Sequence, residues 1–76
     1  MFCTIRMNDN DDVMRVSRVA ALSGIELTVS KGHVIVDPRS VLGLFNFVGE
    51  EVTLVAPENV DHITFGKVVK QMGVAI

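Results

Sequence analysis

The sequence predicts a small α+β domain, in which one four-stranded antiparallel sheet is covered by helices on a single face. Short segments of alternating apolar and polar residues, typical of half-buried strands, are separated by segments with helical spacing. Glycine and proline stand at the boundaries between these segments. Strands and helices in this proportion favour one antiparallel or mixed sheet, with the second face open to water or to a partner.

The length, charge and cysteine content limit the class of protein. The chain has 76 residues, so we expect residues 1–76 to form a single domain with one modest core. Its only cysteine, Cys3, cannot form an internal disulfide, and a free thiol suits a reducing cytoplasm. A net charge of −2 with scattered basic residues argues against nucleic-acid binding. Because no membrane-spanning run or signal peptide is visible, we expect a soluble cytoplasmic protein.

The first part of the chain is expected to form a strand and a helix. Residues 2–7 alternate and predict the strand. The acidic stretch Asn8–Asp12 predicts a loop, with Asp11 as the N-cap of a helix over residues 12–23. Asp11 is also expected to face Arg15, four residues later.

A β-hairpin is expected next. Residues 25–30 alternate again, and Lys31-Gly32 predicts a tight turn because Gly32 can adopt positive φ. Val34 and Val36 belong to the returning strand, which Pro38 ends.

The last part adds two helices and a strand. Residues 40–47 predict a helix of about two turns, residues 51–56 a strand, and residues 59–72 a second long helix. Its apolar positions are expected to include Val60, Ile63, Val68 and Met72. The predicted order is therefore β-α-β-β-α-β-α.

Residues 31–45 resemble the centre of an HPr-type phosphocarrier of the bacterial sugar phosphotransferase system. The stretch Arg39-Ser40-Val41-Leu42-Gly43-Leu44-Phe45 is similar to the Lys-Ser-Ile-Met-Gly-Val/Leu-Met segment of HPr proteins from Gram-positive bacteria. The order of elements over the whole chain is also similar. This resemblance implies an HPr-like open-faced β-sandwich.

The reactive half of the family motif is missing. The family carries Gly-Leu-His-x-Arg-Pro at the start of its first helix, where the histidine accepts a phosphoryl group and helix N–H groups hold its oxygens. This chain has Asn8-Asp9-Asn10-Asp11-Asp12 there, without histidine, arginine or proline. We therefore expect no catalytic residue and no cofactor. The aspartates are interpreted as a capped, solvated helix start; a metal site formed by Asp9, Asp11 and Asp12 is the alternative.

Ser40 is the candidate regulatory site. In the resembling family the matching serine is phosphorylated by a regulatory kinase, and the short helix after it docks partner proteins. A phosphate at a helix N-terminus is favoured by free N–H groups. Ser40 can equally be a plain N-cap, and a further alternative makes Asp37 the N-cap with Pro38 at the first helical position.

The apolar run after Ser40 supplies the candidate docking surface. One face of a short helix cannot bury all of its large side chains, so part of the run is either core or interface. The candidate docking residues are Val41, Leu42, Leu44, Phe45 and Phe47.

The expected function is a non-catalytic regulatory domain that binds a protein partner, such as an HPr-type kinase or a transcriptional regulator, with a homo-oligomer as a further possibility. One alternative is a phosphocarrier that uses His33 or His62 as an unusual acceptor. The other is a ligand-binding regulatory domain of ferredoxin-like type, which shares the β-α-β-β-α-β order.

Overall fold

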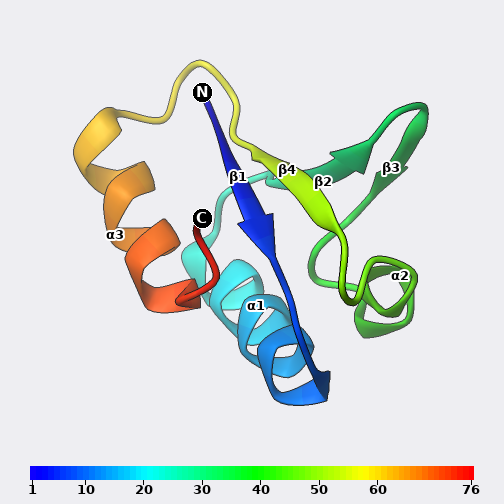
Figure 1. Cartoon of the computed structure of the whole chain (residues 1–76). Coiled ribbons are helices and arrows are strands. Elements are labelled where there is room, and N and C mark those ends of the chain that lie inside the picture. Colours follow the sequence, from blue (N-terminus) through cyan, green and yellow to red (C-terminus); the bar gives the residue numbers. More distant parts are fainter.

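The α+β class, the element order and the four-stranded antiparallel sheet predicted from the sequence are confirmed in a computed structural model, which describes residues 1–76. The strands are adjacent in the order β1-β4-β2-β3. The elements are β1 (Phe2–Arg6), α1 (Asn10–Ser23), β2 (Thr28–Lys31), β3 (Val34–Val36), α2 (Val41–Phe45), β4 (Glu51–Val55) and α3 (His62–Met72). Figure 1 shows α3 and α2 at opposite ends of the molecule, with α1 between them.

One face of the sheet forms the core and the other is open. Alternation along the strands buries Ile5, Val29 and Leu54 completely. Thr4 and Thr53 alternate with buried residues of β1 and β4. They pair with each other on the opposite face of the sheet and remain more accessible. This arrangement is compatible with an open-faced sandwich.

The start of α1 differs from the prediction, because Asp9 and not Asp11 is the N-cap. The Asp9 carboxylate accepts a hydrogen bond from the Asp12 backbone N–H at 2.9 Å. In return, the Asp12 carboxylate accepts from the Asn8 N–H at 2.8 Å. Asp12 also forms the ion pair with Arg15 that was expected of Asp11. The reciprocal bonds start the helix earlier than the prediction and leave Asp11 exposed to solvent.

The hairpin turn lies one residue later than predicted. Gly32 and His33 form the turn, and Lys31 pairs with Val34 across its base. Gly32 has a φ of 60°, which supports the expected role of this glycine. The preceding strand, β2, begins at Thr28 rather than at residue 25.

Helix α3 begins later than predicted, and one of its expected apolar positions is exposed. Asp61 is its N-cap, with the carboxylate accepting from the Thr64 N–H at 2.7 Å. Ile63, expected on the apolar face, is 73% exposed. Val68 and Met72 are buried as predicted, and Phe65 is buried beside them because the three recur at spacings of three and four residues and so share one side of the helix.

The residues after α3 close one edge of the sheet. The N–H of Arg6 donates to Val74 O at 2.9 Å, and the N–H of Ile76 donates to Thr4 O at 3.1 Å. The outer side of β1 is therefore paired with the C-terminal segment. Since β1 and β3 are the two outermost strands, β3 provides the free edge of the sheet.

Candidate docking site on helix α2 and the start of helix α1

Helix α2 is positioned by a hydrogen-bonded linker, residues 37–40. The Asp37 carboxylate accepts from the backbone N–H of Arg39 at 2.9 Å and from its Nε at 3.0 Å. These bonds from Arg39 lower the pKa of Asp37, and the carboxylate raises the pKa of Arg39. The buried Ser17 hydroxyl of α1 donates to Arg39 O at 3.1 Å. The linker is thereby attached to the side of α1.

Ser40 is the N-cap of α2. Its Oγ accepts from the Gly43 N–H at 3.4 Å, and its own N–H donates to Asp37 O at 2.9 Å. The alternative with Asp37 as N-cap is wrong, because the helix begins at Val41 and the Ser40 hydroxyl accepts from the N–H of its first turn. Ser40 itself is exposed. The helix has five residues, so it is shorter than the stretch 40–47 suggested.

Gly43 allows α2 to lie directly against β3. A Cβ atom added at Gly43 would lie 3.3 Å from the Val36 Cβ, which is tighter than an ordinary van der Waals contact. The glycine shared with the resembling segment therefore has a packing role, since it fixes how closely α2 approaches the hairpin.

The predicted docking residues separate into buried and exposed groups. Leu44 is fully buried and Phe47 is 4% exposed, so neither side chain can be a docking contact. Leu42 is 83% exposed and Phe45 39% exposed, while Val41 is partly buried against the core. Directions about 100° apart per residue place Leu44 toward the core and Leu42 away from it. The expectation that a large apolar side chain stays exposed on this helix is confirmed.

The acidic stretch before α1 adjoins the segment that follows α2. Residues 8–11 and Val48 line a shallow surface depression, and the Gly49 N–H donates to Met7 O at 2.7 Å. The segment that follows α2 is therefore attached near the start of α1. On α1 itself, Met14 is 47% exposed.

The electrostatics at the start of α1 are those of a capped helix. The hydrogen bond from the Asn8 N–H, with a further contribution from Arg15, lowers the pKa of Asp12. Asp9 is likewise bound to a backbone N–H. No group of three or more His, Cys, Asp or Glu side chains is arranged to hold a metal ion, so the metal alternative for these aspartates has no structural support.

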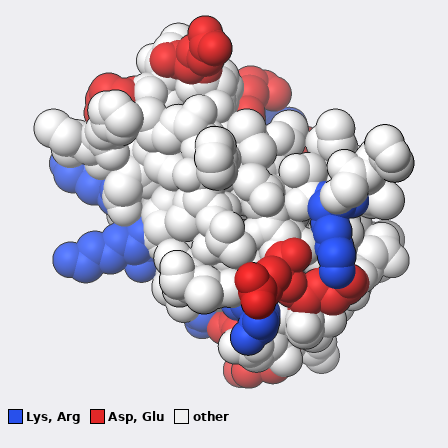
Figure 2. Space-filling view, turned by 45° about the horizontal axis from the view of Figure 1, so that its top comes forward, with Lys and Arg blue, Asp and Glu red and all other residues white.

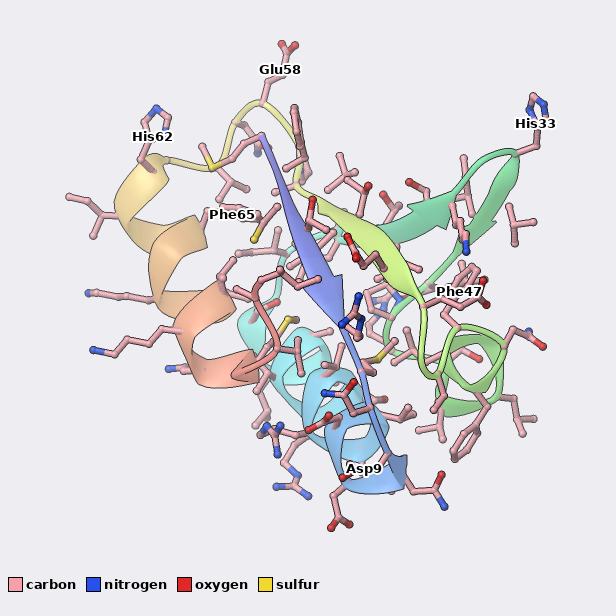
Figure 3. The ribbon with its side chains drawn as sticks, in the orientation of Figure 1. Asp9, His33, Phe47, Glu58, His62 and Phe65 are labelled. Atoms are coloured by element: carbon pink, nitrogen blue, oxygen red, sulfur yellow. The ribbon has the colours of Figure 1, made fainter.

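The two histidines lie far from this region and from each other. Figure 3 shows His33 at the tip of the hairpin and His62 at the start of α3, on opposite sides of the molecule and both pointing outward. Asp9 lies at the start of α1, on the side of the molecule away from both histidines. His62 is the first residue of α3, but the adjacent Asp61 carboxylate already holds the Thr64 N–H and hydroxyl there.

The face shown in Figure 2 carries charges of both signs. Basic side chains lie at its left edge and acidic ones at its top, and a group of both signs lies at its lower right. Exposed ion pairs, such as Arg6 with Glu51, further mix the two signs. None of the helices is long and apolar enough to span a membrane.

Sequence reasoning overlooked Ser17, although a signal for it was present. Val13, Val16, Ser17 and Ala20 recur at positions i, i+3, i+4 and i+7, and all are buried. A serine on a buried stripe needs a hydrogen-bond partner. Here that partner is Arg39 O, so Ser17 connects the core face of α1 to the linker before α2.

A comparison of the chain with protein-family models and with curated proteins gave no match.

Proposed function

We propose that this chain is a non-catalytic HPr-like regulatory domain, which acts by binding a protein partner through α2. The observation that carries the proposal is the exposure of Leu42, at 83%, on the same short helix that Ser40 caps. A large apolar side chain that leaves water only on binding can supply part of the affinity for a partner. Phe45, partly exposed on α2, extends the same surface.

The arrangement of the strands supports an HPr-like fold over the ferredoxin-like alternative. In a ferredoxin-like sheet the third strand lies between the first two, so that β1 and β2 flank β3. In this chain β4 lies between β1 and β2, and β3 pairs only with β2 at the edge of the sheet. Together with the short helix between β3 and β4, this pattern favours the open-faced sandwich implied by the resemblance.

The start of α1 supports a role without phosphoryl transfer. A carrier needs a nucleophilic imidazole next to free helix N–H groups and a cation for the phosphoryl oxygens. In the corresponding place this chain has Asp9 and Asp12, both hydrogen-bonded to backbone N–H groups. The local carboxylates would repel a phosphorylated donor.

Ser40 is the proposed regulatory position within this surface. Its hydroxyl is exposed and close in sequence to Leu42 and Phe45. Phosphorylation would add roughly two negative charges at the edge of the apolar surface. The modified domain would therefore present a different surface to its partner. An HPr-type kinase and a transcriptional regulator are the proposed partner classes.

The proposal is tested by binding and labelling with purified components. The protein is incubated with ATP and an HPr-type kinase, and separately with phosphoenolpyruvate and the first enzyme of the phosphotransferase system. We expect acid-stable label from the kinase, lost in Ser40→Ala, and no acid-labile label from the second reaction. Stoichiometric acid-labile label at His33 or His62 would contradict the proposal and favour the carrier alternative.

Binding of the kinase is then measured by calorimetry for a matched pair of variants. Leu42→Asp should weaken binding by about tenfold or more, as expected for an apolar contact at an interface. Ile63→Asp, which changes a similarly exposed residue on α3, should bind like the unchanged protein. Equal affinity of the two variants would remove α2 as the docking surface.

A further inference from the structure

Residues 73–76, which we call the strap, cover the outer edge of β1 but bury little of themselves. The Arg6 N–H donates to Val74 O at 2.9 Å, and the Ile76 N–H donates to Thr4 O at 3.1 Å. Val74 is the one buried residue of the strap, and the other three are exposed. Segments with few buried side chains and exposed backbone hydrogen bonds open at a lower free energy than the core. The strap has both properties.

Strand β1 does not need the strap to stay in the sheet. On its inner side it pairs with all five residues of β4, and its Ile5 side chain is fully buried in the core. Bonded and non-bonded pairs alternate along an antiparallel ladder. Arg6 and Thr4 therefore direct their backbone groups to the strap, whereas Ile5 directs its N–H to β4. Opening of the strap would leave β1 in place and expose its outer edge, where another strand can pair.

The strap is joined to α3 by a glycine in a left-handed conformation. Gly73 is the C-cap of α3, with a φ of 67°, and its N–H donates to Val69 O at 3.2 Å. Because glycine adopts many backbone conformations at little steric cost, rotation at this residue can move the strap away from β1. Met72, the residue before it, is fully buried, so α3 stays anchored to the core.

One side chain of α1 holds the junction between α3 and the strap. The Arg15 Nε donates to Met72 O at 2.8 Å and lies 3.6 Å from the position of a Cβ atom added at Gly73. The last carbonyl groups of a helix have no partner within the helix. The bond from Arg15 satisfies one of them and fixes the peptide from which the strap leaves. The same guanidinium pairs with Asp12, whose carboxylate also accepts from the Asn8 N–H.

We propose that the strap opens separately from the rest of the domain, and that Arg15 is the positioning residue that controls how often it opens. In the open state Val74 leaves the core, and the Arg6 N–H and the Thr4 carbonyl form a free sheet edge. Because Asp12 holds Arg15, the start of α1 is coupled to this edge, and loss of the ion pair favours the open state. This device does not depend on the function proposed for α2.

The test is amide hydrogen exchange of the full chain, followed by NMR at low urea concentrations. We expect the Arg6 and Ile76 amides to show similar protection that hardly changes with urea, because opening of the strap exposes little surface. The Ile5 amide should exchange at least about tenfold more slowly, through global unfolding, and its rate should rise about fivefold per molar urea. If Arg6 and Ile76 show the rate and urea dependence of Ile5, the strap opens only with the whole domain and the proposal is overturned.

The role of Arg15 is tested by a matched pair of variants. Arg15→Met retains the aliphatic stem but removes the donors, so the Arg6 and Ile76 amides should exchange about tenfold faster. Arg18→Met is the control, because Arg18 is an exposed arginine of the same helix without an ion pair, and it should leave both rates unchanged.

Circular dichroism shows whether the variants are folded. If Arg15→Met is not, Arg15→Lys takes its place and should give a smaller increase in the same two rates, because lysine keeps one donor group. Unchanged rates in the Arg15 variant, or an equal increase in Arg18→Met, would overturn the role of Arg15.

Discussion

Leu42 and Leu44 provide a sharp test of the geometry of α2, because the same residue type occurs twice on one short helix in opposite environments. Leu44 is fully buried and Leu42 is 83% exposed. Replacing a buried leucine with alanine loses its transfer free energy and leaves a cavity, which together cost about 2–5 kcal/mol. Full burial of such a side chain is worth about 1.5–3 kcal/mol, so the small buried part of Leu42 contributes only about 0.5 kcal/mol or less.

These free energies convert into well-separated melting temperatures. In a domain of this size, 1 kcal/mol shifts the Tm by about 4–8 °C. Leu44→Ala should therefore lower the Tm by at least about 8 °C, and Leu42→Ala by less than about 4 °C. The assay is thermal unfolding followed by circular dichroism. Leu44→Met is the control, because it conserves volume and should cost less than about 1.5 kcal/mol. Equal Tm values for Leu42→Ala and Leu44→Ala would refute the placement of α2.

Three further predictions concern hydrogen bonds and caps. Ser17→Ala should lower the free energy of unfolding by about 1–3 kcal/mol in a urea titration, because the Arg39 carbonyl loses its buried donor; an unchanged midpoint would show that this bond does not hold the linker. Asp9→Ala should cost about 1 kcal/mol through loss of the cap, whereas Asp11→Ala should cost only about 0.3 kcal/mol through the helix dipole, and the reverse order would restore Asp11 as the N-cap. Hydrogen bonds lower the pKa of three aspartates, which are Asp12, Asp37 and Asp61. Their folded-state pKa values lie below the ordinary 3.8, so the ionised carboxylates stabilise the folded protein fully above that pH. This stabilisation is lost as the pH falls through the folded-state pKa values. The Tm should therefore be flat near neutrality and fall in acid, and a Tm that rises in acid would contradict this.

The elements that the sequence predicted well are those with a local cause. Alternation in β1 and β4 and the glycine at the hairpin turn depend on neighbouring residues, and the structure has them where the pattern indicated. The position of the α1 cap is different, because several neighbouring residues compete for it. Asp9, Asp11 and Asp12 can all cap a helix, and the pattern alone does not show that the bonds among Asn8, Asp9 and Asp12 select Asp9.

The candidate site was predictable only in part for a similar reason. Helical spacing showed that the apolar run after Ser40 could not be wholly buried, but it did not give the direction of the core. The packing of Gly43 against Val36 and the bond from Ser17 to Arg39 fix that direction, and both join residues distant in sequence. Leu44 therefore turned out to be core and Leu42 surface. The free edge at β3 also depends on tertiary structure, because the C-terminal segment covers the other edge.

The start of α1 shows how a stable helix end and an anion site compete for the same groups. The first N–H groups of a helix have no partner within the helix, so they can bind either a capping side chain or a phosphoryl oxygen. In this chain the Asp9 carboxylate occupies the N–H of Asp12, and Asp12 itself carries a carboxylate bound to Asn8 and Arg15. An incoming phosphoryl group would have to displace one anion and approach another. The absence of a histidine and the presence of the aspartates act in the same direction, which is why we propose a role in contact rather than in transfer.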